Sequence, residues 1–528
     1  MKNIIKSILL TVAVLGLNSC SEDKILDLVP VNNVPTDVAF STPTYIETYM
    51  NGVYNAAAIG TYNSGTSNGG RGYVWGAAFV EQGECMGEDV VNNATFYQLT
   101  YTQTYDPTSA NNVYYWVDGY RLINRCNLMI EGTTDAVAKG IITKAVGDDY
   151  IGQAKFLRAI THFELLNYFA RPYNFTAGGT HPGIPYREVG VNTQAEIDSE
   201  NLKPRNTVAQ CYNKVIADLN DAESLIVSNG FNNGLRVVAK ATKSAAIAFK
   251  TRVYLQKRDW ANVITEGVKL NGLYTLTAKP NDVFVPASNL SNTESIFSIQ
   301  HSATANPGVN AGLASILNAR ALVNISPIIW RNTKWLADDK RREEGVMIKT
   351  VAGRKYTNKY SDVTNLTDAA PVIRYAEVVL NMAEAQARLS NTTVALNLLN
   401  SVRNRALANP VATPANPVGQ AYTAASFATP ADLVAGILVE RRIEFLVEGR
   451  RWSDIHRLQG DPITSVAING IPAKLANAAP AAALYTLGTP YPGPYGVPAL
   501  PYTDYKFIWP IPQIEMNTNP GLGQNPDW

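Results

Sequence analysis

The stretch DYIGQAKFLRAITHFELLNYFA, residues 149–170, carries the clearest helical pattern in the chain. Its apolar side chains recur mostly every three or four residues, at Ile151, Ala154, Phe156, Leu157, Ile160, Phe163, Leu166 and Phe169. This spacing gathers them on one face of an α-helix. Pro172 follows, as is common just beyond a helix end. The stretch therefore predicts a helix with a broad buried face.

Further stretches on the C-terminal side show the same periodicity. They cover residues 207–227, 240–256, 259–270, 372–389, 394–407 and 430–448. Loops rich in Gly, Pro and Asn separate them, and strand-like runs are short, at residues 295–300 and 506–511. Successive antiparallel helices of this kind are typical of tetratricopeptide repeats, although long loops make the period irregular here. The sequence predicts a mostly α fold, with tetratricopeptide-like helical hairpins, an irregular loop-rich region and a few short strands.

Motifs spread along the chain, in a fixed order, identify a family. They are QAKFLRA at 153–159, GIP at 183–185, AKATKSAA at 239–246, DW at 259–260, PVIRYAE at 371–377, LLNSVRNRA at 398–406, ERRIEF at 440–445 and WPIP at 509–512. Together they resemble the SusD/RagB family, with minor departures at Gln153, His162 and Phe445. The resemblance covers almost the whole chain after its N-terminal segment.

The resemblance implies a SusD-like fold and a function. It implies a non-catalytic surface lipoprotein that captures a glycan and delivers it to a SusC-like TonB-dependent outer-membrane transporter. An oligopeptide ligand is the close alternative, and a surface glycoside hydrolase is a third interpretation. On the same basis we expect an N-terminal region with the first helical hairpins over residues 20–270 and a C-terminal region over residues 271–528.

The first 20 residues predict a targeting segment. Lys2 and Lys6 precede an apolar run over residues 8–17, which is too short to span a membrane. The tail Leu-Asn-Ser-Cys ending at Cys20 resembles a bacterial lipobox, with Asn18 departing from the usual small residue. We expect a signal peptide at residues 1–19, lipidation of Cys20 and anchoring to the outer membrane, facing the cell exterior. An ordinary secretory signal is the alternative.

The composition argues against several function classes. Lys and Arg number 45 against 44 Asp and Glu, so the basic surplus typical of nucleic-acid binders is absent. Four histidines without metal-ligand spacing give no support for a metal site or a cofactor. Cys85, Cys126 and Cys211 show no paired-cysteine motif, which favours buried free thiols over a single disulfide. We expect no nucleic-acid partner, no metal and no cofactor.

Two acidic clusters invite a catalytic or metal-binding interpretation. Glu440, Glu444 and Glu448 repeat every four residues among several arginines, a pattern that favours ion pairs over an acid–base pair. Residues 81–89 hold three glutamates and an aspartate, which could bind calcium but favour a solvated acidic turn. We therefore expect no catalytic residue in either cluster.

Aromatic and amide side chains between residues 60 and 106 suggest the binding site. Flat rings stack on sugar faces, and amides bond to sugar hydroxyls. We predict that Trp75, Tyr73, Asn92, Asn93 and Tyr97 contact ligand and that Trp330 adds a second wall. The reason is that loops outside a helical scaffold bury few rings, so some should stay exposed. The alternative is that these rings seal the scaffold.

Overall fold

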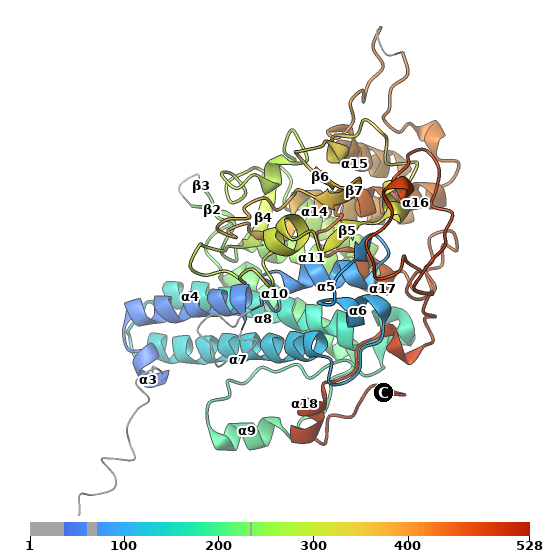
Figure 1. Cartoon of the computed structure of the whole chain (residues 1–528). Coiled ribbons are helices and arrows are strands. Elements are labelled where there is room, and N and C mark those ends of the chain that lie inside the picture. The colour runs from blue at the N-terminus through green and yellow to red at the C-terminus, as the bar shows by residue number, and fades with distance from the viewer. Residues whose placement is uncertain (1–35, 61–70, 233–234, 415–416) are drawn as a thin grey trace, which may run out of the picture.

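The computed structural model describes residues 36–60, 71–232, 235–414 and 417–528. The fold is mostly helical, as predicted, and its few strands are short (Figure 1). The targeting segment and Cys20 lie outside the described residues. Among the residues that are described, no helix is long and apolar enough to cross a membrane.

The first half of the chain is built around one central helix. Its helices are α3 (Thr36–Ala39), α4 (Pro43–Ile59), α5 (Ala78–Met86), α6 (Gln98–Thr102), α7 (Ala110–Ala138), α8 (Lys144–Phe169), α9 (Gln194–Glu200), α10 (Val208–Leu225), α11 (Lys243–Lys257) and α12 (Trp260–Val268). The predicted helix at 149–170 is α8, which begins earlier because the Thr143 hydroxyl caps it by accepting from the Val146 N–H. Both α7 and α10 pack on α8, so its second half is buried on all sides.

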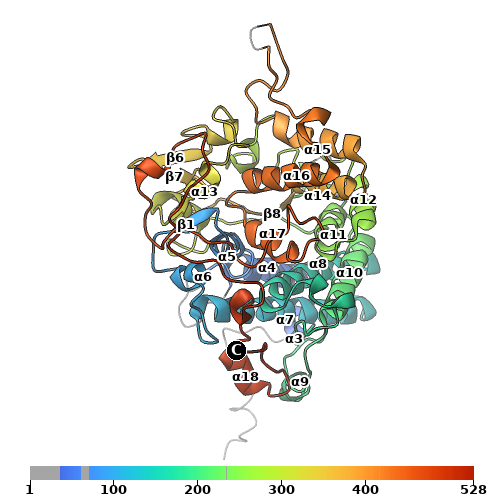
Figure 2. The same ribbon diagram turned by 90° about the vertical axis from the view of Figure 1, so that its right-hand side faces the viewer.

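The second half adds further helical hairpins. Its helices are α13 (Pro327–Trp330), α14 (Tyr375–Arg388), α15 (Thr392–Asn404), α16 (Pro430–Glu444), α17 (Arg451–Arg457) and α18 (Gln513–Thr518). Figure 2 shows α15, α16 and α14 stacked above α11, α8 and α10, with strands and loops gathered on the other side of the molecule. This arrangement confirms the predicted division between a helical scaffold and a loop-rich region.

The strands form four two-stranded antiparallel sheets within the described residues. The pairs are β1 (Val90–Asn92) with β5 (Val323–Ile325), β2 (Phe231–Asn232) with β3 (Leu235–Arg236), β4 (Ser295–Ile299) with β8 (Ala370–Arg374) and β6 (Ile348–Val351) with β7 (Arg354–Thr357). The strand predicted at 295–300 is β4. The start of the helix predicted at 372–389 is wrong, because residues 372–374 belong to strand β8, which pairs with β4.

The strand predicted at 506–511 is also wrong. Residues Tyr505–Phe507 form a 3-10 turn, and the Asp504 carboxylate caps it by accepting from the Lys506 N–H. The chain then runs extended, and the Trp509 N–H donates to the Tyr168 carbonyl at the end of α8. The apolar residues of this run are buried against the end of a helix and not in a sheet.

Buried glutamates and arginines tie the hairpins of the second half together. Arg341 contacts both Glu440 and Glu444, at 2.6 and 2.9 Å. Arg374 of β8 reaches Glu444 and Glu448, each at 2.8 Å. All five side chains are buried. The ion-pair interpretation of the glutamate stripe is confirmed, since each carboxylate faces an arginine from another element.

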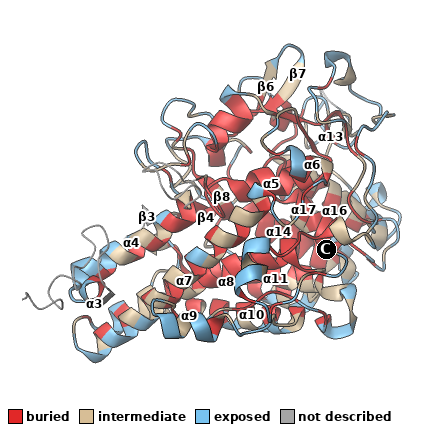
Figure 3. Ribbon diagram, turned by 60° about the horizontal axis from the view of Figure 1, so that its bottom comes forward, coloured by how far each residue is buried: buried red, intermediate tan, exposed pale blue. Residues whose placement is uncertain are grey.

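The core runs through the middle of the helical stack. Figure 3 shows buried residues concentrated on α8, α11 and α14, while the outer faces of α9 and α10 are exposed. Cys85, Cys126 and Cys211 are buried free thiols, as predicted. Burial raises the pKa of the Cys211 thiol to about 11, so it stays protonated at neutral pH.

Candidate functional site

The predicted rings do not remain exposed, and this expectation was wrong. Trp75 is 0 % exposed, and its indole N–H donates to the Thr161 hydroxyl of α8 at 3.0 Å. Tyr73 is 1 % exposed and donates to the Asn111 amide oxygen. Tyr97, 2 % exposed, donates to Glu81. The physical reason is that residues 71–106 do not lie outside the scaffold but fold as α5, β1 and α6 against its core.

The remaining predicted residues are occupied by contacts within the protein. The Asn92 amide donates to the Ala94 carbonyl and the Asn477 side chain, and the half-buried Asn93 donates to the Ala321 carbonyl and the Asn324 side chain. Trp330 is 5 % exposed and packs edge-on to Trp335, with the Arg342 guanidinium 4.4 Å from its ring. Among the six, only Asn93 offers a ligand appreciable surface.

The acidic cluster at residues 81–89 is not a solvated turn. Its carboxylates are buried, because α5 packs against α17 and the residues that follow α5 meet Arg442 of α16. Glu88 pairs with Arg442 and Arg451, and Asp89 pairs with the same two arginines. Burial raises the pKa of Glu81 to about 8, although the Tyr97 hydroxyl and the charge of Arg71 act in the opposite direction. No group of acidic, histidine or cysteine side chains in the described part of the chain is arranged to hold a metal ion.

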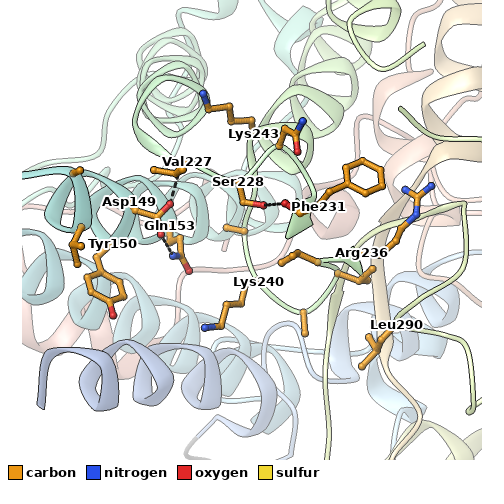
Figure 4. Close-up of a pocket in the computed structure, with 17 residues that line it drawn as sticks. Asp149, Tyr150, Gln153, Val227, Ser228, Phe231, Arg236, Lys240, Lys243 and Leu290 are labelled. Carbon is orange, nitrogen blue, oxygen red and sulfur yellow. Dashed lines mark hydrogen bonds between the residues drawn. The ribbon is translucent and has the colours of Figure 1, made fainter. Parts of the chain in front are cut away.

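A hollow in the described residues lies beside the first half of α8. It encloses about 1070 Å³ between α8 and residues 227–243, and we call it the open pocket (Figure 4). The Asp149 carboxylate accepts from the Val227 N–H and from the Gln153 amide, at 2.8 and 2.7 Å, and so fixes the loop against the helix. The rings of Tyr150 and Phe231 add flat apolar surface to the wall.

A second hollow adjoins the open pocket at Ala239 and Lys240. It encloses about 380 Å³ between α4 and the end of β4, and we call it the amide pocket. Its rim carries three exposed amide side chains, those of Asn51, Asn55 and Gln300. Asn51 and Asn55 lie four residues apart and share one face of α4.

Tyr54 connects the two hollows. Its hydroxyl donates to the Gln153 side chain and accepts from the Ala241 N–H, both at 2.8 Å, which joins α4 to α8 and to the segment before α11. Burial raises the pKa of this hydroxyl, and burial also lowers the pKa of His301 on the floor of the amide pocket. Both groups are therefore neutral at neutral pH.

The amides at the rim are available to a ligand. Within the part of the chain that the structure describes, the side chains of Asn51, Asn55 and Gln300 make no hydrogen bond. Each amide offers a carbonyl acceptor and two N–H donors. Free amides beside apolar rings suit a ligand that carries many hydroxyl groups on a ring skeleton. Sequence reasoning missed them, although their spacing at i and i+4 was visible.

A third hollow has its polar groups already paired. It encloses about 660 Å³ between α7 and residues 185–201. The Asn124 side chain bonds to the Val191 carbonyl and N–H, and Arg187 pairs with Glu200 at 3.0 Å. A ligand there would have to displace these bonds. The open and amide pockets are the better candidate site.

Comparison with known proteins places this fold in one class of surface proteins. The family model described as "SusD family" matches residues 320–528, and the one described as "Starch-binding associating with outer membrane" matches residues 24–255. The two models together cover most of the sequence. The chain belongs to the SusD/RagB family.

Solved structures and curated relatives agree with this assignment. A SusD superfamily protein from Bacteroides fragilis is 26% identical, with a TM-score of 0.73 over 92% of this chain and 99% of that one. A SusD-like carbohydrate binding protein from Bacteroides vulgatus shares the fold at 21% identity, with a TM-score of 0.69 over 91% and 97% of the chains. SusD-like protein P38 from Formosa agariphila is 22% identical over 89% of this chain and 94% of its own length.

Proposed function

We propose that this protein is a non-catalytic glycan-binding lipoprotein that holds an oligo- or polysaccharide in the open and amide pockets. The observation that carries this proposal is the set of free amides in the amide pocket, which adjoins the aromatic rings of the open pocket. The family's description as starch-binding supports it, and so does the carbohydrate-binding relative with the same fold. The protein would pass its glycan to a SusC-like TonB-dependent transporter in the outer membrane.

The groups lining the pockets favour binding over hydrolysis. Glycoside hydrolysis requires two carboxyl groups on either side of the scissile bond. Among described residues that line the two pockets, Asp149 is the single acid, and its two oxygens accept hydrogen bonds from within the protein. Release of reducing ends from any glycan that the purified protein binds would contradict the non-catalytic assignment.

Replacing Asn51 and Asn55 together by Ala should weaken glycan binding by about 10- to 100-fold. Each lost hydrogen bond is typically worth about 0.5–1.5 kcal/mol, and each 1.4 kcal/mol is about tenfold in affinity. Both positions are exposed on α4, where Ala favours the helix, so the fold should be retained. Calorimetry of the wild type against a panel of glycans and oligopeptides identifies the ligand, and the variant is then measured on it.

Asn397→Ala is the matched control, because this asparagine is exposed on α15, far in sequence from the pockets, and makes no hydrogen bond among the described residues. It should leave affinity unchanged. If the double variant binds as tightly as the control, the amide pocket is not the site. Binding of peptides but no glycans would favour the oligopeptide alternative.

Cys20 is proposed as the lipid anchor, with the signal peptide removed before it. A single acyl chain holds a protein only reversibly, whereas several chains hold it firmly. Cys20→Ala should therefore move the protein from the outer-membrane fraction to the soluble fraction. Labelling of intact cells by a protease or an impermeant biotin reagent tests whether the wild type faces the exterior. Unchanged fractionation of the variant would contradict the anchor.

A further inference from the structure

Three cationic side chains line the open pocket, and none of them forms an ion pair with a carboxylate of the described residues. The ammonium groups of Lys240 and Lys243 make no hydrogen bond, ion pair or ring contact within the described residues. Arg236 donates to the Leu273 carbonyl and lies 4.7 Å from the Phe231 ring, and it forms no ion pair with any described carboxylate. These three cations outnumber Asp149, the one acid among the described residues that line the pocket, so the wall carries a surplus of positive charge.

The acid in the wall, Asp149, offsets one of these three positive charges. Asp149 accepts hydrogen bonds from the Val227 N–H and the Gln153 amide, which leaves its oxygens engaged with neutral groups of the protein. Burial, followed by the carboxylates of Glu47 and Asp149, raises the pKa of Tyr150. Glu47 thus lies near Tyr150, but it does not line the pocket.

The position of Lys243 also indicates that the pocket carries surplus positive charge. It is the first residue of α11, and the first turn of this 15-residue helix holds no acidic side chain. The N-terminus of a helix carries partial positive charge, so a cation there is unfavourable for the helix itself. Thr242 caps the helix through its hydroxyl, which accepts from the Ala245 N–H. Lys243 therefore adds positive potential at the pocket without stabilising α11.

From this arrangement we infer that the glycan bound by the open pocket is anionic and carries carboxylate or sulfate groups. The inference rests on the proposed function and narrows its substrate class. Figure 4 shows Lys240 and Lys243 on opposite sides of the pocket, with Arg236 beyond Phe231. Cations spread in this way suit a chain with anionic groups on several sugar units.

The test uses matched polysaccharide pairs that differ in charge. One pair is polygalacturonate and its fully methyl-esterified form, and the other is dextran sulfate and dextran. The wild-type protein should bind the charged member of at least one pair about tenfold or more tightly than the neutral member. Because exposed charges are screened by salt, this preference should shrink when the ionic strength rises from about 0.05 to 0.5 M.

The double variant Lys240→Gln/Lys243→Gln should lose most of this preference, with an unchanged or slightly raised melting temperature. The control Lys139→Gln/Lys334→Gln removes two exposed lysines that lie outside the pocket. This control should retain the preference for the charged polysaccharide. Comparison of the polygalacturonate pair with the dextran sulfate pair shows whether the pocket prefers carboxylate or sulfate groups.

Three outcomes would overturn the inference. They are equal binding of charged and neutral members, an equal loss in both double variants, and no binding of either charged polysaccharide. Tight binding of a neutral glycan in the calorimetric panel, together with any of these results, would leave the proposed function standing. If the protein binds no glycan at all, both the inference and the proposed function are contradicted.

Discussion

Glu444→Gln is expected to lower the free energy of unfolding by about 3–5 kcal/mol, the usual cost of removing one partner from a buried ion pair. Glu444 is 2 % exposed and lies between the guanidinium groups of Arg341, Arg374 and Arg405, at 2.9, 2.8 and 2.5 Å. The amide would leave this positive charge buried and partly unpaired. Urea unfolding at neutral pH measures the loss.

The loss of stability caused by Glu444→Gln should depend on pH. Burial alone would raise the pKa of Glu444, but the arginines lower it well below its ordinary value of 4.5. A carboxyl whose pKa is lowered on folding stabilises the protein above its unfolded pKa and loses that contribution as the pH falls. The difference between variant and wild type should therefore shrink below about pH 4.5.

Glu188→Gln is the matched control for this experiment. Glu188 is also paired with a cation, Lys214, but the carboxylate is 45% exposed. Surface ion pairs contribute about 0–1 kcal/mol, so this variant should unfold almost as the wild type does. Ligand affinity should be unchanged in both variants. Loss of binding by Glu444→Gln without loss of stability would contradict its structural role.

Trp75→Ala should also cost about 3–5 kcal/mol of stability, as truncation of a large buried ring does. Trp75 packs against Phe79, with ring centroids 5.3 Å apart, and hydrogen-bonds to Thr161 of the central helix α8. The affinity of the Trp75→Ala variant for glycan should stay unchanged in the folded fraction, because Trp75 lines neither pocket. Melting temperature and affinity are measured on the same preparation.

Trp75→Phe separates the ring from its hydrogen bond. Phe retains most of the apolar packing and loses the bond to Thr161, so it should cost less than the Ala variant. If Trp75→Ala weakens binding strongly and leaves the melting temperature unchanged, the original prediction of ligand contact is right and the packing interpretation is wrong.

Much of the fold could be predicted from the sequence because apolar periodicity reflects burial directly. The helix at 149–170 and the later hairpins follow from it. The longest described helix, α7, was missed because its buried face includes Asn112, Asp118 and Asn127, which break the apolar pattern. The Asn127 amide oxygen accepts from Arg158 of α8 at 2.9 Å, and this partner becomes visible only in the folded protein.

The site was harder to predict, because ligand contact depends on which side chains are left without partners. Trp75 and Tyr73 have the right chemistry for sugar stacking, but nothing local to residues 60–106 shows that the turn before α5 lies in the core. The free amides of Asn51 and Asn55 look ordinary in sequence. Their importance comes from Ala239, Lys240 and Gln300, which the fold brings beside them from far along the chain. The division of the chain at residue 270 stays a prediction.

The hydroxyl of Tyr54 joins three segments, and the pockets on either side of it depend on all of them. An unfolded or partly folded chain therefore has no such pocket to offer. A ligand that binds only the assembled state stabilises it in proportion to the logarithm of its concentration, by about 2.7 kcal/mol at 100 times the dissociation constant. A glycan that filled these pockets would thus also lengthen the lifetime of the folded protein.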